Sequence, residues 1–170
     1  MWYVIQTHGG EEEKTADMIR KRLPPYCMEE CFIPKRERMK KFHGNWNRVE
    51  EILFRGYVFV ISGQPENLYQ ELQSIPMLTK VLGREKNYFL PLNREEEELI
   101  QRLGDEKHKT TISKVEVVEG KSIRIIEGPL KGYVGNIVKV NLHKREVMIQ
   151  VEFMKRSLEL YMGIEMIDAK

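Results

Sequence analysis

The sequence predicts an α+β protein made of two domains. Strand and helix patterns alternate through residues 1–103, whereas only strand patterns follow a polar segment at residues 104–111. That segment, G-D-E-K-H-K-T-T, contains no apolar residue and is the best candidate for a linker. We therefore expect a first domain over residues 1–103, a linker over 104–112 and a second domain over 113–170.

The first domain opens with a run of β-forming residues at Trp2–Thr7, which two glycines break. A helix is expected over Glu11–Leu23, because Ala16, Ile19 and Leu23 fall on one of its faces. Two prolines then stop this helix. The domain therefore begins with a strand followed by an amphipathic helix.

The remaining elements of the first domain follow from the same patterns. We expect strands at Met28–Ile33, Ile52–Phe54 and Tyr57–Ile61, a short helix at Glu66–Gln73, and extended pieces at Val81–Leu82 and Tyr88–Leu92. A last helix runs to Leu103. Asn93 caps it, Glu96 stands at the third position of a capping box, and Gly104 ends it.

The second domain is organised around a glycine-rich turn. Two strand patterns, Ser122–Ile126 and Asn136–Val140, flank a loop that contains Gly128, Pro129, Gly132 and Gly135. Further strands are expected at Val115–Val118, Val147–Phe153, Leu158–Leu160 and Ile164–Ile167. Such short strands need closure to hide their edges, so we expect a small five-stranded β-barrel.

Composition excludes several classes of protein. The 28 basic and 26 acidic residues nearly cancel, so any nucleic-acid surface must come from local clustering. No apolar run approaches the ~20 residues of a membrane span, and the first residues lack signal-peptide features. We expect a cytoplasmic monomer with no membrane partner.

No residue set indicates an enzyme, a cofactor or a metal site. Cys27 and Cys31 have a C-x3-C spacing with no second pair, so we expect reduced, partly buried thiols. The four histidines are scattered, and no catalytic triad or phosphate-cradling loop is indicated. The carboxylates of Glu95–Glu98 lie in the first turns of a predicted helix, where acids are stabilised in any case.

Four stretches in order resemble the NusG family of transcription factors. They are W-Y-V-I-Q-T at 2–7, R-G-Y-V-F-V at 55–60, the glycine-rich stretch at 119–140, which looks like a KOW motif, and F-M-K-R-S-L-E-L at 153–160. The resemblance implies an NGN domain with an antiparallel sheet flanked by helices, a ferredoxin-like variant. It also implies that the barrel is an SH3-like KOW domain.

The same resemblance implies RNA polymerase as a partner. In this family the NGN domain bridges the two largest polymerase subunits, and the KOW domain recruits RNA or other proteins. Trp2, Phe54 and Tyr57 match the aromatic positions that face polymerase. The alternative is that these rings belong to the core, as aromatic residues on strands usually do.

Basic residues gather at Lys35–Arg48, where a hairpin is expected around Gly44. Its candidates for contact with non-template DNA are Lys35, Arg36, Arg38, Lys40, Lys41 and Arg48, with Trp46 as a stacking ring. The alternative is a solvated basic arm.

Basic residues of the barrel are candidates for contact with a nascent RNA hairpin. They are Arg124, Lys131, Lys139, His143, Lys144, Arg145, Lys155 and Arg156. Two basic pairs, at residues 144–145 and 155–156, lie in expected turns. The alternative is ordinary surface charge, since residues 113–170 carry 10 basic and 8 acidic residues.

Departures from the family pattern indicate a specialised paralogue. Arg55 stands where NusG proteins carry a proline, and Met154 and Lys155 replace the Gly-Arg of the F-G-R run. The chain is similar in this respect to LoaP, an antiterminator of long operons whose KOW domain binds an RNA hairpin. Two alternatives stay open: a housekeeping NusG that binds ribosomal protein or Rho, and a ribosomal-type KOW protein.

Overall fold

The computed structural model describes residues 1–75, 89–119, 122–133 and 136–167. It divides into two compact units, which are described separately below. Unit 1 contains Met1–Ile33 and Phe54–Glu97, and unit 2 contains Pro34–Leu53 and Glu98–Lys170. The extended piece expected at Val81–Leu82 lies outside the described residues.

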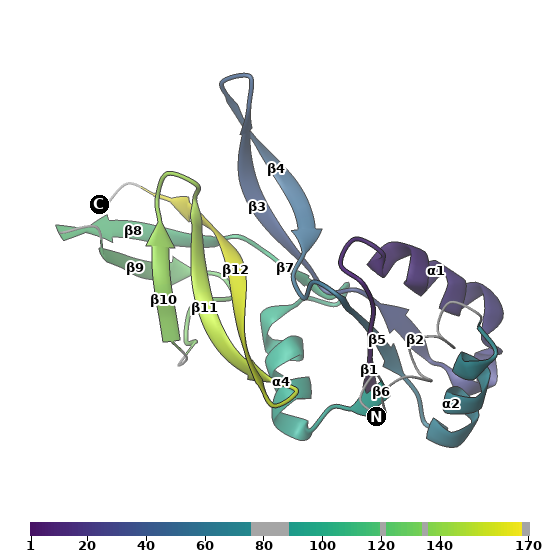
Figure 1. Ribbon diagram of the computed structural model, residues 1–170. Helices are drawn as coiled ribbons and strands as arrows, with labels where there is room; N and C mark the ends of the chain where they lie inside the picture. The colour runs from purple at the N-terminus through teal and green to yellow at the C-terminus, as the bar shows by residue number, and fades with distance from the viewer. Residues whose placement is uncertain (76–88, 120–121, 134–135, 168–170) are drawn as a thin grey trace. The chain divides into compact units, whose positions relative to one another are not determined.

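Unit 1 is a four-stranded antiparallel sheet accompanied by helices (Figure 1). Its strands, in spatial order, are β2 (Glu30–Phe32), β5 (Tyr57–Ile61), β1 (Trp2–Gln6) and β6 (Phe89–Pro91). Its helices are α1 (Glu12–Arg22), the short 3-10 turn η1 (Pro25–Cys27) and α2 (Pro65–Gln73). The central strands β1 and β5 are apolar on both faces and almost wholly buried, which confirms them as the core of this unit.

Glu12 holds the start of α1 to two loops of unit 1. Its carboxylate accepts hydrogen bonds from the amides of Gly10, at 3.0 Å, and Gly56, at 2.9 Å, and the residue is 1% exposed. Burial alone would raise the pKa of this carboxyl, but the amide donors and the Arg55 guanidinium outweigh it and lower the pKa. Glu12 is therefore a buried anion that ties three chain segments together.

Both cysteines lie in the core of unit 1. Cys27 and Cys31 are free thiols, and each is at least nine-tenths buried. Burial raises the pKa of the Cys31 thiol to about 12, so it is not a reactive thiolate at neutral pH. The expectation of reduced thiols is confirmed, and their burial is more complete than expected.

Unit 2 contains a long hairpin, most of α4 and a curled five-stranded sheet. The hairpin strands β3 (Lys35–Phe42) and β4 (Asn45–Ile52) join β7 (Lys109–Thr110) in a three-stranded sheet. Strand β7 pairs in parallel with the first two residues of β3, so the segment expected as a linker contributes to this sheet. Strand β4 ends at Ile52, two residues before the expected end.

The curled sheet has the strand order β10-β11-β12-β8-β9. The strands are β8 (Ser113–Val118), β9 (Ser122–Glu127), β10 (Asn136–Asn141), β11 (Glu146–Phe153) and β12 (Arg156–Met166). Alternate residues of β11, from Val147 to Phe153, are buried and form the core of this sheet. The expected strands are present, but the sheet is curled, and its two end strands are β9 and β10.

One boundary of the expected sheet is wrong. Leu158–Leu160 and Ile164–Ile167 were expected to be separate strands, but β12 includes the first and all of the second except Ile167, and it passes through Gly163 without a break. The glycine is needed for close packing, because a methyl group there would collide with the carbonyl oxygen of Glu37 in the hairpin. Gly163 is therefore a contact point and not a strand end.

The capping box at the start of α4 (Arg94–Leu103) is confirmed. The Asn93 side chain accepts a hydrogen bond from the Glu96 amide at 2.8 Å, and the Glu96 carboxylate accepts one from the Asn93 amide at 3.2 Å. Leu103 and Ile100 are buried on its apolar face. Among the described residues, no helix is long and apolar enough to cross a membrane.

We predict that Glu12→Gln destabilises the protein in a pH-dependent way. The neutral amide loses charge-assisted hydrogen bonds in a buried place, which should cost about 1–3 kcal/mol at neutral pH. Because the folded-state pKa of Glu12 is lowered, its contribution is complete above the ordinary glutamate pKa of about 4.3. It is lost as the pH falls through the folded-state value, so the two proteins should converge in acid.

Urea unfolding at several pH values checks this prediction. Glu66→Gln is the matched control, since Glu66 also lies in the first turn of a helix, α2, but is exposed. An equal effect of the two substitutions at neutral pH would show that the amide contacts of Glu12 do not stabilise the fold.

Candidate nucleic-acid interface

The β3–β4 hairpin carries its charges in two separate zones. Its strands turn at His43 and Gly44, both with positive φ, and the register pairs Lys41 with Trp46 and Arg36 with Glu51. Near the turn the side chains of Lys40 and Lys41 are exposed, whereas Arg36 at the other end is buried. The expected basic hairpin is confirmed, but its charges do not all face solvent.

Arg36 is the centre of a buried ionic cluster within unit 2. Its guanidinium donates to Glu51 at 2.8 Å and to Glu146, on strand β11, at 3.1 Å. Arg38 lies 3.5 Å from the same Glu146 oxygen and 3.7 Å from Glu51. The side chains of Arg36 and Glu146 are 8% and 10% exposed, so these charges are engaged with each other.

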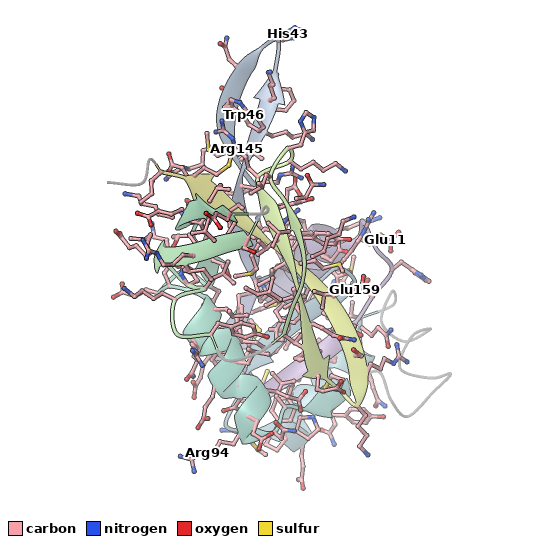
Figure 2. The ribbon with its side chains drawn as sticks, turned by 90° about the vertical axis from the view of Figure 1, so that its left-hand side faces the viewer. Glu11, His43, Trp46, Arg94, Arg145 and Glu159 are labelled. Carbon is pink, nitrogen blue, oxygen red and sulfur yellow. The ribbon has the colours of Figure 1, made fainter. Side chains whose placement is uncertain are left out.

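Farther along the hairpin, Trp46 contacts the turn that joins β10 to β11. The Arg145 guanidinium lies over the Trp46 ring, with its central carbon 3.8 Å from the ring centroid. The Arg38 guanidinium also donates to the backbone carbonyl of Lys144 at 3.4 Å. Figure 2 shows the labelled Trp46 and Arg145 next to each other, with His43 farther out on the hairpin.

The β10–β11 turn is shaped by its own hydrogen bonds. The Asn141 side chain accepts from the Lys144 amide at 3.0 Å, and Arg145 adopts a positive φ of 54°. His143 and Lys144 are exposed at this turn. The turn and the neighbouring part of the hairpin together present cations around an aromatic ring, a combination suited to phosphates and bases.

We call this surface the tip interface and define it by residues of the hairpin and of the β10–β11 turn. Its members are Lys40, Lys41, Trp46, His143, Lys144 and Arg145. Lys41 joins it through Trp46, since the Lys41 amine lies 6.0 Å from the ring centroid. The structure thus brings residues expected to touch DNA together with residues expected to touch RNA.

The other RNA candidates lie apart from the tip interface. Arg124 is ion-paired with Glu116 across β8 and β9, and Lys131 is exposed after the Gly128 turn. Lys155 and Arg156 follow the opposite end of β11, which spans eight residues and separates the two basic turns by roughly 25 Å. The two basic pairs are therefore not adjacent, and Lys139 lies on β10 between them.

The hairpin cations outside the tip interface contact acidic partners. Arg48 lies 3.7 Å from Glu37, and Lys109 lies 3.2 Å from the same carboxylate. The hydrogen bond to Glu37 raises the pKa of Lys109. Lys35 is half-buried at the start of β3. The positive charge expected for Lys35–Arg48 is therefore largely balanced near the base of the hairpin by glutamates.

The three aromatic residues expected to face RNA polymerase lie in unit 1. Trp2 is 8% exposed, Tyr57 is 9% exposed and Phe54 is 1% exposed. The Trp2 ring packs edge-on against Phe32 at 5.3 Å, and Phe54 packs edge-on against Phe59 at 5.5 Å. All three contribute to the core, and their polymerase contact stays a prediction.

Sequence reasoning missed Glu51, Glu146 and Gly163. With the turn placed at His43 and Gly44, the antiparallel register pairs Arg36 with Glu51. The contact with Glu51 could therefore have been predicted from the sequence. Glu146 lies 110 residues from Arg36 in the chain, and no local pattern links them. The role of Gly163 depends on the same long-range contact.

The chain combines a four-stranded antiparallel sheet accompanied by helices with a curled five-stranded sheet. The family model described as transcription termination factor NusG matches residues 1–101, and the KOW motif model matches residues 114–152. The first match covers more than half of the chain. The chain belongs to the NusG family of transcription factors.

Relatives and a solved structure agree with this assignment. NusG of Pasteurella multocida is 26% identical over 92% of this chain and 87% of its own, and NusG of Bacillus subtilis is 25% identical over 98% and 97%. Both are named transcription termination/antitermination proteins. A structure on domain interaction in Thermotoga maritima NusG has the same fold, with a TM-score of 0.56, 22% identity and coverage of 95% and 92%.

We predict that Glu146→Ala destabilises unit 2. Arg36 would keep Glu51 but lose its other buried acceptor, and a lost hydrogen bond to a charged group costs about 1.5–3 kcal/mol. Urea unfolding of the full chain measures the loss. Glu159→Ala removes an exposed carboxylate from the adjacent strand β12 and serves as the control. A loss no larger than that of the control would refute a stabilising role for the cluster.

Proposed function

We propose that this chain is a specialised NusG-type antitermination factor. Its N-terminal domain, residues 1–103, docks on the two largest subunits of RNA polymerase in the cytoplasm. Its C-terminal domain, residues 113–170, acts as an SH3-like KOW barrel and binds a hairpin in the nascent RNA. The polymerase then elongates past terminators in long operons. The factor acts as a monomer and needs no cofactor.

The observation that carries this proposal is the altered run at residues 153–160. Met154 and Lys155 form the turn between β11 and β12, with positive φ values of 54° and 60°. A glycine suits such a backbone better than methionine, and housekeeping NusG proteins resemble one another in having glycine there. The substituted turn favours a partner different from theirs.

The tip interface supports nucleic acid as that partner. Lys144 and His143 are exposed on the β10–β11 turn, and Lys41 lies by the Trp46 ring. Flexible cations attract phosphates, and guanidinium planes stack on unpaired loop bases. The exposed lysines of the hairpin are also the residues that we propose for contact with non-template DNA.

Two weak contacts suffice for operon-specific action. A factor held on polymerase meets the emerging RNA as an intramolecular ligand, at an effective concentration that reaches the millimolar range for short linkers. The RNA contact therefore needs only moderate affinity to select one transcript. On this proposal the N-terminal domain keeps the factor bound to polymerase, and the C-terminal domain selects the transcript.

A housekeeping NusG is the second candidate function. The relatives are named termination/antitermination proteins and match almost the whole chain, and that name is compatible with either function. On that alternative the C-terminal domain binds ribosomal protein or Rho and not RNA. A ribosomal-type KOW protein is the third candidate and would not bind polymerase.

We predict that the full chain binds a structured leader RNA from its own operon and not a scrambled sequence of equal length. Lys144→Ala should weaken binding and reduce the salt dependence of the binding constant by roughly one unit, as expected for one lost phosphate contact. Fluorescence anisotropy of labelled RNA across a salt series measures both quantities.

Lys114→Ala is the control, because Lys114 is an exposed lysine on β8 outside the candidate set. Binding that is equally tight for both RNAs and falls steeply with salt would show that the chain binds phosphates without sequence specificity. Capture of ribosomal protein or Rho without RNA would then favour the housekeeping function. A parallel pull-down with RNA polymerase separates either function from a ribosomal-type KOW protein.

A further inference from the structure

The Arg145 guanidinium stacks on the Trp46 ring. Each of these two groups could otherwise bind nucleic acid. The guanidinium lies 3.8 Å from the ring centroid, and its Nε atom is buried with no hydrogen-bond acceptor among the described residues. Arg145 also holds a left-handed backbone, with φ at 54°. The side chain is therefore directed onto the ring and not toward an anion that the described residues provide.

The stack blocks both of its members. An arginine binds RNA through its planar fork, to phosphates, or through its flat face, to bases. A tryptophan binds unpaired nucleotides through its ring face. In the stack, the flat face of Arg145 covers a face of Trp46, so neither can receive a base on the shared side.

The contact is also weak enough to exchange. A partly exposed cation–π contact shifts an equilibrium by about three- to tenfold, which stacking on one RNA base can match. The base of the hairpin is held differently, by the buried pair between Arg36 and Glu146. Loss of the stack would thus loosen the hairpin beyond Arg38, which itself donates to the Lys144 carbonyl, while the base stays attached.

We propose that the Trp46–Arg145 stack is a latch that RNA opens. RNA bound at the β10–β11 turn takes Arg145 through a phosphate or a loop base, and Trp46 is released. The Trp46 ring, beside the exposed Lys40 and Lys41, then becomes available for a second nucleic-acid strand. This inference rests on the proposed RNA binding and adds to it a route by which RNA recognition uncovers the Trp46 ring.

If RNA releases Trp46 from Arg145, then removal of Trp46 should in turn strengthen RNA binding. Because RNA and Trp46 compete for Arg145, removal of the ring should favour RNA. Trp46→Ala should bind the leader RNA about three- to tenfold more tightly than the native chain. Phe42→Ala is the matched control, since Phe42 is an exposed aromatic ring of the same hairpin that contacts Lys40. It should leave RNA affinity unchanged.

A direct test follows the two tryptophans by ¹⁹F NMR in the full chain labelled with 5-fluorotryptophan. Trp46→Phe assigns the two resonances, and buried Trp2 serves as the internal reference. Addition of leader RNA should move the Trp46 resonance toward that of the Arg145→Lys variant, which keeps the charge but lacks the planar face. The Trp2 resonance should not move.

The outcomes separate the latch from the function on which it rests. RNA binding by anisotropy together with the Trp46 shift and tighter binding by Trp46→Ala supports the latch. RNA binding with an unmoved Trp46 resonance, or with weaker binding by Trp46→Ala, overturns the latch and leaves RNA recognition intact. Absence of RNA binding by anisotropy overturns both. Circular dichroism of each variant confirms that the comparison is between folded proteins.

Discussion

The buried guanidinium of Arg36 is the constraint that organises unit 2. A cation with an 8% exposed side chain must find anions, and it has two, one from its own hairpin and one from β11. The ring of Tyr161 lies beside it as well, 5.6 Å from the guanidinium carbon. Apolar residues of similar size would often be at least as stable, so the value of this cluster is that it fixes one orientation of the hairpin on the sheet. Gly163 allows the hairpin backbone at Glu37 to approach β12 closely.

The same cluster decides where positive charge remains available. Counted along the sequence, the hairpin is basic throughout, yet Arg36 and Arg38 lie between carboxylates and Arg48 lies near Glu37. Charges paired within a few ångströms contribute little field at a distance, particularly at physiological salt, where screening acts over about 8 Å. The exposed Lys40 and Lys41 therefore carry most of the attraction for phosphates. The arrangement concentrates that attraction near the turn of the hairpin, beside the Trp46 ring.

Features with local signals were predictable from the sequence, and features set by distant contacts were not. The Asn93 capping box, the hairpin turn at His43 and Gly44 and the amphipathic α1 depend on residues within a few positions of one another. Gly163 looked like a break between two strands because its partner, the Glu37 backbone, is far away in the chain. The composition of the tip interface was not predicted, for the same reason. Trp46 and Arg145 were each assigned a nucleic-acid contact, but only the tertiary structure reveals that they contact each other.

The hairpin belongs to one module by sequence and to the other by contact. The NusG family match includes it, since that match runs over residues 1–101, whereas its packing places residues 34–53 with the curled sheet. Its base is secured by buried ion pairs, which are costly to break. Farther out, it is held to the β10–β11 turn by the hydrogen bond from Arg38 to the Lys144 carbonyl and by the exchangeable contact of Trp46 with Arg145. Disruption of the contact between Trp46 and Arg145 would therefore loosen the outer part of the hairpin before its base.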